Sequence, residues 1–99
     1  MPRQYDVYDT RDGPTVVILQ SDLLAETNTR VVIPLRPQGD WRRPAGHIHP
    51  QVQIGGTSAR LDPLFITTLT LDDLTTHRGT LRNERDLITR AVDALTSGI

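Results

Sequence analysis

The sequence contains no cysteine and no lysine. The absence of cysteine excludes disulfides, thiolate nucleophiles and structural zinc sites of the thiolate kind. All eleven basic residues are arginine, and twelve acidic residues bring the formal net charge to -1. A general nucleic-acid-binding protein carries a basic surface, so this balance argues against direct binding of nucleic acid by the chain alone.

Long apolar runs are missing as well. The run at residues 16–19 is far shorter than the roughly 20 residues that a membrane-spanning helix needs, and no signal peptide is recognisable. We therefore expect a cytoplasmic protein with no membrane partner. The 99 residues are enough for a single domain, 1–99, and chains of this size often gain stability by forming dimers.

The first half of the chain has strand patterns. Residues 5–8 alternate and residues 15–20 are β-branched and almost continuously apolar, with an Asp-Gly-Pro turn between them, which predicts a hairpin. Residues 31–36 resume the strand pattern, and Pro34 indicates an edge position or a bulge because proline cannot donate to a sheet ladder. Residues 21–30 fit a loop or one helical turn, in which Leu23 and Leu24 cannot both point inward.

The second half adds three strand signals and the only long helical pattern. Gly55 and Gly56 predict a tight turn between strands at 47–54 and 57–61, and residues 64–71 predict another strand. Asn83 is the expected cap of a terminal helix, and Gly98 has the position of a C-cap glycine. The apolar stripe of this helix comprises Leu87, Ile88, Ala91, Val92 and Leu95. The pattern predicts a mainly β fold of five to seven antiparallel strands with one C-terminal helix.

Few residues carry an obvious chemistry. His47 and His49 form an H-x-H pair, but a metal site would need Asp40 or His77 to be brought in by the fold, so we expect no metal and interpret the pair as surface or interface histidines. Asp72 and Asp73 are expected in cap and turn roles.

No nucleophile elbow or phosphate-binding loop is recognisable, so we predict no cofactor and no catalytic residue. Trp41 lies in a polar loop, either covering the core or binding a partner. A small endoribonuclease stays an alternative, because a site of arginine, histidine and carboxylate leaves no linear motif. Such a site should show an arginine, a carboxylate or histidine and a hydroxyl converging in a dimer groove, and we expect no such convergence.

Three stretches together resemble the CcdB toxins of plasmid and chromosomal type II toxin-antitoxin modules. LQSDLLAETNTRVVIPL at 19–35 resembles the family signature of Gln-Ser-Asp, two large aliphatics, a polar loop, an arginine and a Val-Ile-Pro-Leu strand. HPQVQIGG at 49–56 resembles the middle hairpin, and LRNERDLITRAVDALTSGI at 81–99 resembles the terminal helix. The resemblance implies a CcdB/MazF-like fold, namely an SH3-like antiparallel barrel or sheet with a small β wing and one C-terminal helix.

The resemblance also implies a function. CcdB toxins are symmetric homodimers that bind the A subunit of DNA gyrase and trap the cleaved gyrase-DNA complex, a role linked to plasmid maintenance. A CcdA-like antitoxin with a disordered tail reverses the block. Such a toxin is not an enzyme. The implied gyrase-binding residues are Leu23, Leu24, Asp93, Ser97, Gly98 and Ile99.

Two of these positions depart from the family pattern. Ser97 stands where the family has tryptophan, and Asp93 stands where asparagine is usual. An interface tryptophan can contribute about 2 to 4 kcal/mol, roughly thirty- to a thousand-fold in affinity. The sequence therefore leaves three alternatives: a gyrase poison, a CcdB-fold protein with weakened, lost or retargeted toxicity, and a barrel-fold endoribonuclease toxin.

Overall fold

A computed structural model of the chain describes residues 1–37, 39 and 48–98. Asp40, Trp41, His47 and Ile99 lie outside the described residues, so the predictions made for them are not tested. The strands are β1 (Asp6–Thr10), β2 (Val16–Ile18), β3 (Thr29–Pro37), β4 (Gln51–Ile54), β5 (Thr57–Leu61), β6 (Thr67–Thr70) and β7 (Leu74–Thr80). The helical elements are the short 3-10 turns η1 (Asp22–Leu24), η3 (Pro63–Phe65), η4 (Leu71–Asp73) and η5 (Arg82–Glu84), and the α-helix α1 (Arg85–Ser97).

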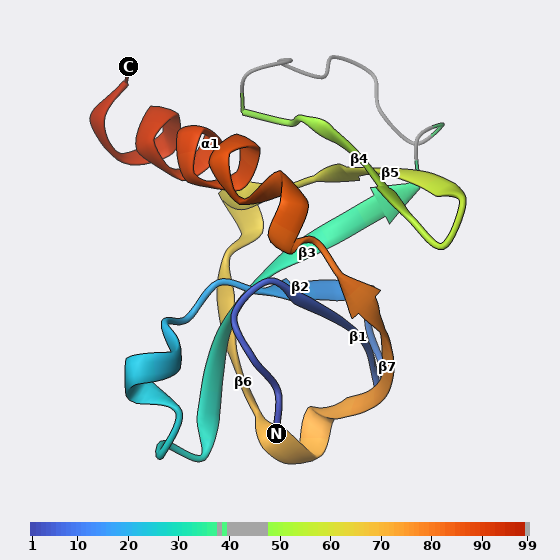
Figure 1. Cartoon of the computed structure of the whole chain (residues 1–99), viewed down its shortest axis with the longest axis vertical. Helices are drawn as coiled ribbons and strands as arrows, with labels where there is room; N and C mark the ends of the chain where they lie inside the picture. Colours follow the sequence, from blue (N-terminus) through green and yellow to red (C-terminus); the bar gives the residue numbers. More distant parts are fainter. Residues whose placement is uncertain (38, 40–47, 99) are drawn as a thin grey trace.

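The described strands form one antiparallel sheet in the order β4-β5-β3-β2-β1-β7, and β6 pairs with the first half of β3. Figure 1 shows the sheet curling into a half-barrel, with β4 and β5 projecting as a wing and α1 lying alongside. The predicted mainly β fold with a wing and one C-terminal helix is confirmed. None of the helices in the described ranges is long and apolar enough to cross a membrane.

Local sequence explains the two hairpins. β2 is buried at all three residues, because its β-branched run is covered on both faces of the sheet. It pairs with β1 as predicted. Gly55 and Gly56 have φ angles of 57° and 79°, the left-handed values that a tight two-residue turn requires, so the predicted hairpin is confirmed. Its first strand begins at Gln51, because residues 48–50, including Pro50, are not extended into the ladder.

Pro34 does not mark an edge strand. It lies in β3, which pairs with β2 on one side and with β6 and then β5 on the other. Asp62 donates its N–H to the Pro34 carbonyl at 2.9 Å, whereas Leu35 donates toward β2. The Pro34 nitrogen therefore faces the junction where the neighbouring strand changes from β6 to β5, and the missing donor breaks no ladder bond.

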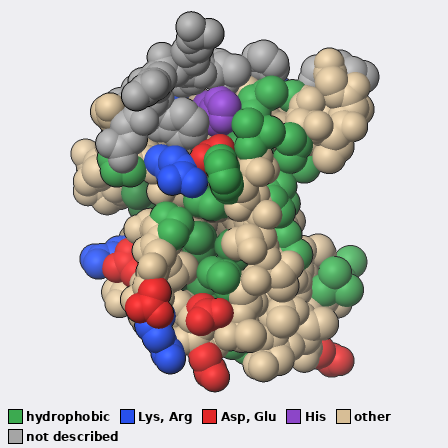
Figure 2. All heavy atoms as spheres, turned by 180° about the vertical axis from the view of Figure 1, so that it is seen from behind, with side chains coloured by type: hydrophobic (Ala, Val, Ile, Leu, Met, Phe, Trp, Pro, Cys, Tyr) green, Lys and Arg blue, Asp and Glu red, His purple; other side chains and the backbone are tan. Residues whose placement is uncertain are grey.

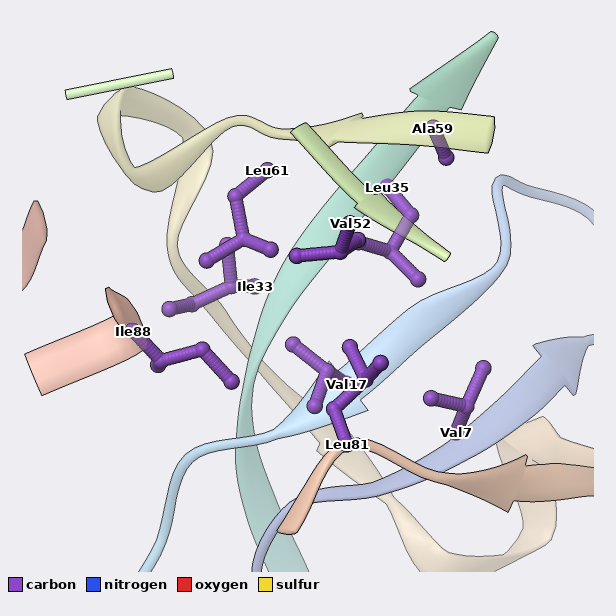
Figure 3. Packing of buried hydrophobic residues seen from close by; sticks show 9 residues of the cluster. All are labelled: Val7, Val17, Ile33, Leu35, Val52, Ala59, Leu61, Leu81 and Ile88. Carbon is purple, nitrogen blue, oxygen red and sulfur yellow. The ribbon is translucent and has the colours of Figure 1, made fainter. Parts of the chain in front are cut away.

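Two apolar clusters lie on the two faces of the sheet. Figure 3 shows the larger one, in which Ile88 of α1 points toward residues of the sheet. Its buried members are Val7, Val17, Ile33, Leu35, Val52, Ala59, Leu61, Leu81 and Ile88. The smaller cluster has Val16, Ile18 and Val32 at its centre. The alternation of these residues along β2 and β3 follows from the two-residue period of a strand.

The terminal helix begins later than predicted. Residues 82–84 form η5, and α1 starts at Arg85 with Glu84 as its N-cap, so the prediction of Asn83 as the cap is wrong. A tight 3-10 turn at a helix N-terminus displaces the cap by one residue here. Ile88 and Ala91 are buried, as the stripe predicts. Gly98 has φ 74° and donates to the Ala94 carbonyl at 3.0 Å, which confirms it as the C-cap glycine.

Two further predictions need correction. Only residues 67–70 of the predicted 64–71 strand are extended, because Pro63 opens the 3-10 turn η3 and leaves Leu64 and Phe65 exposed. His49 is not a surface histidine: it is 7% exposed, and its Nε2 lies 3.5 Å from Oδ1 of the buried Asp62. Asp73 accepts from the backbone and hydroxyl of Thr70, which confirms its capping role.

Candidate functional site

The exposed leucines lie on the short 3-10 turn η1, which is held by local hydrogen bonds. Leu23 is 93% exposed and Leu24 is 57% exposed, which are unusual values for large apolar side chains in an ordered turn. Ser21 caps η1 by accepting the Leu23 N–H at 3.1 Å. The η1 turn with Leu23 and Leu24 is called the leucine turn below. It holds both side chains outward, which is consistent with the expectation that they cannot both point inward.

Arg30 fixes the base of the leucine turn. The residue is 1% exposed, and its Nη1 donates to the carbonyls of Thr27 and Thr29, both at 2.8 Å. Its Nη2 donates to the Ala25 carbonyl at 3.1 Å, and its Nε to the Pro2 carbonyl at 3.3 Å. Within the described residues, no carboxylate lies within salt-bridge distance of this guanidinium. A buried cation held by loop carbonyls organises the loop around itself, since loss of these bonds would leave carbonyls with fewer or no partners.

Gln20 ties the other side of the same loop. Its side-chain nitrogen donates to the Leu24 carbonyl and the Thr27 hydroxyl, each at 3.0 Å, and its oxygen accepts the Val31 N–H at 3.0 Å. Sequence reasoning missed this role and that of Arg30. Both residues lie in the 19–35 stretch, and a polar residue at each end of a loop was the signal that could have found them.

The end of α1 carries the other predicted contact residues. Asp93, Ser97 and Gly98 are exposed, and the Ser97 hydroxyl donates to the Asp93 carbonyl at 2.7 Å. Figure 1 places the end of α1 and η1 at different ends of the molecule. One chain therefore does not bring the two groups together, and a shared surface would need a second copy.

A second polar cluster, formed by residues of β1, of β7 and of the segment just before β2, lies next to the turn of the wing. The Arg78 Nε donates to Asp9 Oδ2 at 2.8 Å, the Arg78 Nη2 donates to the same oxygen, and the Thr15 hydroxyl donates to Asp9 Oδ1 at 3.0 Å. These residues, called the Asp9 cluster, line a pocket of about 400 Å³ together with Ile54, Gly55 and Thr57. Arginine, carboxylate and hydroxyl therefore converge within one chain, whereas the expectation of no convergence concerned a dimer groove and stays a prediction.

The electrostatics of this region follow from these contacts. Hydrogen bonding from Arg78 holds the pKa of Asp9 below its usual value, and the Thr15 hydroxyl acts in the same direction. The same pair raises the pKa of Arg78. Nearby on β1, burial raises the pKa of Tyr8, and the Asp6 carboxylate adds to the effect. Asp9 is therefore ionised at neutral pH and held in place by donors of two residues, Arg78 and Thr15.

A third cluster next to the wing is centred on the buried side chains of Asp62 and His49. Arg36 Nε lies 2.5 Å from Asp62 Oδ2, while His49 approaches the other oxygen. The Arg36 guanidinium also lies 5.0 Å from the centre of the Phe65 ring. Asp62 is 3% exposed. Through these contacts the cluster joins β3, η3 and the segment before β4. The described residues contain no group of three or more potential metal ligands.

The surface charges are distributed in small mixed groups. Figure 2 shows acidic and basic side chains next to one another on the face in view. This distribution agrees with the net charge of -1. A strongly basic area of the kind that tracks a nucleic-acid backbone is not part of the described surface in this view.

The mainly β fold with a wing, the single C-terminal helix and the two exposed leucines agree with what the three sequence stretches implied. A family model, described as CcdB protein, matches residues 4–98. The chain therefore belongs to the CcdB family, as the three sequence stretches indicated. No curated protein matches the sequence.

Two solved structures are similar to the whole chain. One is an endoribonuclease from mycobacterial species, 19% identical, with a TM-score of 0.75 over 94% of this chain and 88% of that one. The other is an endoribonuclease in complex with its cognate antitoxin, also from mycobacterial species, 20% identical, with a TM-score of 0.76 over 100% of this chain and 97% of that one. The expectation that the chain is not an enzyme rested on the family resemblance alone. These neighbours overturn it, because proteins with the same fold are endoribonucleases.

Proposed function

We propose that this chain is the toxin of a type II toxin-antitoxin module and that its target is the A subunit of DNA gyrase. The observation that carries the proposal is the leucine turn, where Leu23 and Leu24 are exposed on a turn tied down by Ser21, Gln20 and Arg30. Membership of the CcdB family supports gyrase as the partner. Its action is then in the cytoplasm.

The energetics favour a protein contact at this place. Covering a fully exposed leucine side chain contributes about 1.5 to 3 kcal/mol, and the turn is already ordered before binding. An ordered contact surface loses less conformational entropy than a mobile one when the partner arrives. The leucine turn can therefore supply the apolar centre of an interface without a folding step.

A homodimer and an antitoxin are parts of the same proposal. Leu64 and Phe65, each 59% exposed, lie in η3, which contacts α1. A two-fold contact between copies at this place would cover the two apolar side chains and bring two α1 helices near one axis. The neighbour solved with its cognate antitoxin supports an antitoxin partner for this fold.

The test measures cleaved plasmid DNA trapped by gyrase in the presence of the purified protein. We expect the full chain to trap cleaved DNA and the variant Leu23→Ser/Leu24→Ser to require at least about tenfold more protein for the same effect. Thr76→Ala, an exposed substitution on β7, serves as the control and should behave as the unaltered chain. If the full chain traps no cleaved DNA and does not bind gyrase, the target is wrong.

RNA cleavage is the second candidate function, and the Asp9 cluster favours it. The Asp9 carboxylate could accept the proton of a ribose 2′-hydroxyl while the hydroxyl oxygen attacks the adjacent phosphorus. The bond from phosphorus to the 5′-oxygen then breaks, that oxygen takes a proton from water, and a 2′,3′-cyclic phosphate remains. Arg78 already holds Asp9 through its Nε and Nη2, and its permanent positive charge lies beside that carboxylate, where it would oppose the phosphate charge.

RNA cleavage is tested by incubating the chain with a long single-stranded RNA and mapping 2′,3′-cyclic phosphate ends. Under this candidate, Asp9→Asn lowers the cleavage rate by about 100-fold, the usual size of a general-base contribution. Asp12→Asn, an exposed change in the β1–β2 turn, is the matched control. Equal cleavage by Asp9→Asn and the unaltered chain eliminates the Asp9 cluster as the site.

A further inference from the structure

A polar pocket adjoins the leucine turn. It has a volume of about 220 Å³ and is lined by Gln4, Tyr5, Asp22, Arg82 and Arg85. Asp22 is also the first residue of η1, so the pocket wall continues directly into the exposed Leu23. We call it the arginine pocket. It combines segments that are far apart in the sequence, namely the N-terminal segment, η1 and the start of α1.

We propose that the arginine pocket binds an aspartate or glutamate side chain of the cognate antitoxin, beside an apolar antitoxin residue that covers the leucine turn. The inference rests on the proposed function in taking the antitoxin as the partner. It does not depend on which target the toxin acts on.

The charge of the pocket is incomplete. In the described part of the chain, neither Arg82 nor Arg85 has a carboxylate within salt-bridge distance, and the Arg85 Nη1 donates to the Arg82 carbonyl at 3.3 Å. The one carboxylate of the pocket, Asp22, accepts the Gln4 N–H at 2.8 Å. Two positive charges thus face one negative charge, and one incoming carboxylate balances the site. Arginine is suited to this role because its planar fork donates to both carboxylate oxygens.

The size and setting of the pocket favour a side chain of a protein. Pockets for free small ligands usually measure about 300 to 1,000 Å³, so a volume of about 220 Å³ fits part of a larger partner better. A nucleic acid would need further basic residues along its backbone, whereas the chain has a net charge of -1. An acidic residue next to an apolar one in a peptide satisfies both the pocket and the leucine turn.

One wall of the pocket is fixed before any partner arrives. Tyr5 has φ 71°, a left-handed value that is rare for a residue with a side chain. Its N–H donates to the Ile18 carbonyl and its carbonyl accepts the Leu81 N–H, both at 2.7 Å. Its side chain packs against the larger apolar cluster. A wall held from three directions keeps its shape, which favours binding without rearrangement.

Calorimetric titration of the full chain with its cognate antitoxin tests the inference. We expect Arg82→Gln/Arg85→Gln to weaken antitoxin binding by at least about tenfold and to reduce its dependence on salt. Arg90→Gln is the matched control, since Arg90 is exposed on the same helix but does not line the pocket. Equal melting temperatures of the three proteins establish that the substitutions leave the fold intact.

The partner residue is identified by replacing each antitoxin aspartate and glutamate by its amide. One such antitoxin variant should bind the unaltered toxin about as weakly as the unaltered antitoxin binds Arg82→Gln/Arg85→Gln. Combining the two variants should weaken binding no further, which is the signature of a direct contact between the altered residues. The inference is overturned if Arg82→Gln/Arg85→Gln binds the antitoxin with an affinity within twofold of that of the unaltered chain. It is also overturned if the double variant loses affinity only for gyrase or for an oligonucleotide. A failure of gyrase trapping by the unaltered chain rejects the proposed target and leaves this antitoxin result standing.

Discussion

Replacing Arg30 by methionine tests whether a buried cation organises the leucine turn. Methionine keeps an unbranched apolar stem but removes all donors, so the carbonyls of Thr27, Thr29 and Ala25 lose partners at 2.8 to 3.1 Å. A buried carbonyl without a partner costs about 1 to 3 kcal/mol; here Thr29 keeps the Thr27 hydroxyl at 3.0 Å and Thr27 itself is exposed, so the total lies well below three times that figure. Removal of the buried charge and entry of water at the loop offset part of this cost. We expect a net loss of about 3 kcal/mol in the free energy of unfolding.

The assay is urea unfolding followed by far-ultraviolet circular dichroism, together with a thermal scan. For a domain of this size, about 3 kcal/mol corresponds to a melting temperature lower by about 12 to 24 °C. Arg90→Met, at an exposed helix position, controls for loss of one positive charge and should change the unfolding free energy by less than about 0.5 kcal/mol. If Arg30→Met is as stable as Arg90→Met, the carbonyls find other donors and the turn does not depend on Arg30.

Three smaller effects follow from single contacts. The pKa of Asp9 is lowered in the folded state, so its contribution to stability is present above the unfolded pKa and is lost as pH falls through the folded pKa. Between about pH 5 and pH 3 the melting temperature of the unaltered chain should therefore fall more than that of Asp9→Asn. An equal fall in the two proteins would contradict this. Gly98→Ala, at φ 74°, should cost about 1 kcal/mol in urea unfolding, whereas no loss would mean that the helix end has changed conformation. Asp73→Ala removes the acceptor of two Thr70 donors and should cost about 1 kcal/mol, with Asp72→Ala as a neighbouring control that costs less than half as much.

Local pattern was enough to predict the hairpins and the helix. Gly55 and Gly56 require left-handed backbone that few other residues adopt, and the stripe with Ile88 and Ala91 repeats with the helical period. These features depend on residues close in the sequence. The predicted placement of these hairpins and of the helix was therefore right to within a few residues.

Other elements depend on contacts that are distant in the sequence. β7, at residues 74–80, was not predicted because most of its side chains are exposed and show no alternation; it is a strand because it pairs with β1. Its register against β1 is irregular between Val7 and Thr10, which further weakens any period of two. The prediction from Pro34 that β3 is an edge strand is wrong, because the sequence of one strand does not reveal that its neighbour changes from β6 to β5 at this point.

The candidate sites also differ in whether their residues are close or distant in the sequence. Leu23 and Leu24 were found because they lie in one contiguous stretch of the chain. Asp9 and Arg78 are 69 residues apart, and Tyr5 and Arg85 come from opposite ends of the sequence, so no linear motif contains either group. Only the antiparallel pairing of β1 with β7 brings the N-terminal segment beside the residues that precede α1.

The distribution of apolar surface leads to one prediction about target binding. The Ser97 hydroxyl is committed to the Asp93 carbonyl at 2.7 Å, so this position offers a partner little apolar area, whereas Leu23 and Leu24 are exposed. Removing residues 97–99 should therefore weaken binding to gyrase less than Leu23→Ala/Leu24→Ala does, measured by surface plasmon resonance on the same gyrase preparation. Ser97→Trp should strengthen binding by about thirty-fold or more, because a tryptophan at the centre of an interface contributes about 2 to 4 kcal/mol. If Ser97→Trp binds no better and the truncation is the more damaging change, the leucine turn is not the main apolar contact, and the terminal residues act through their backbone and carboxylate instead.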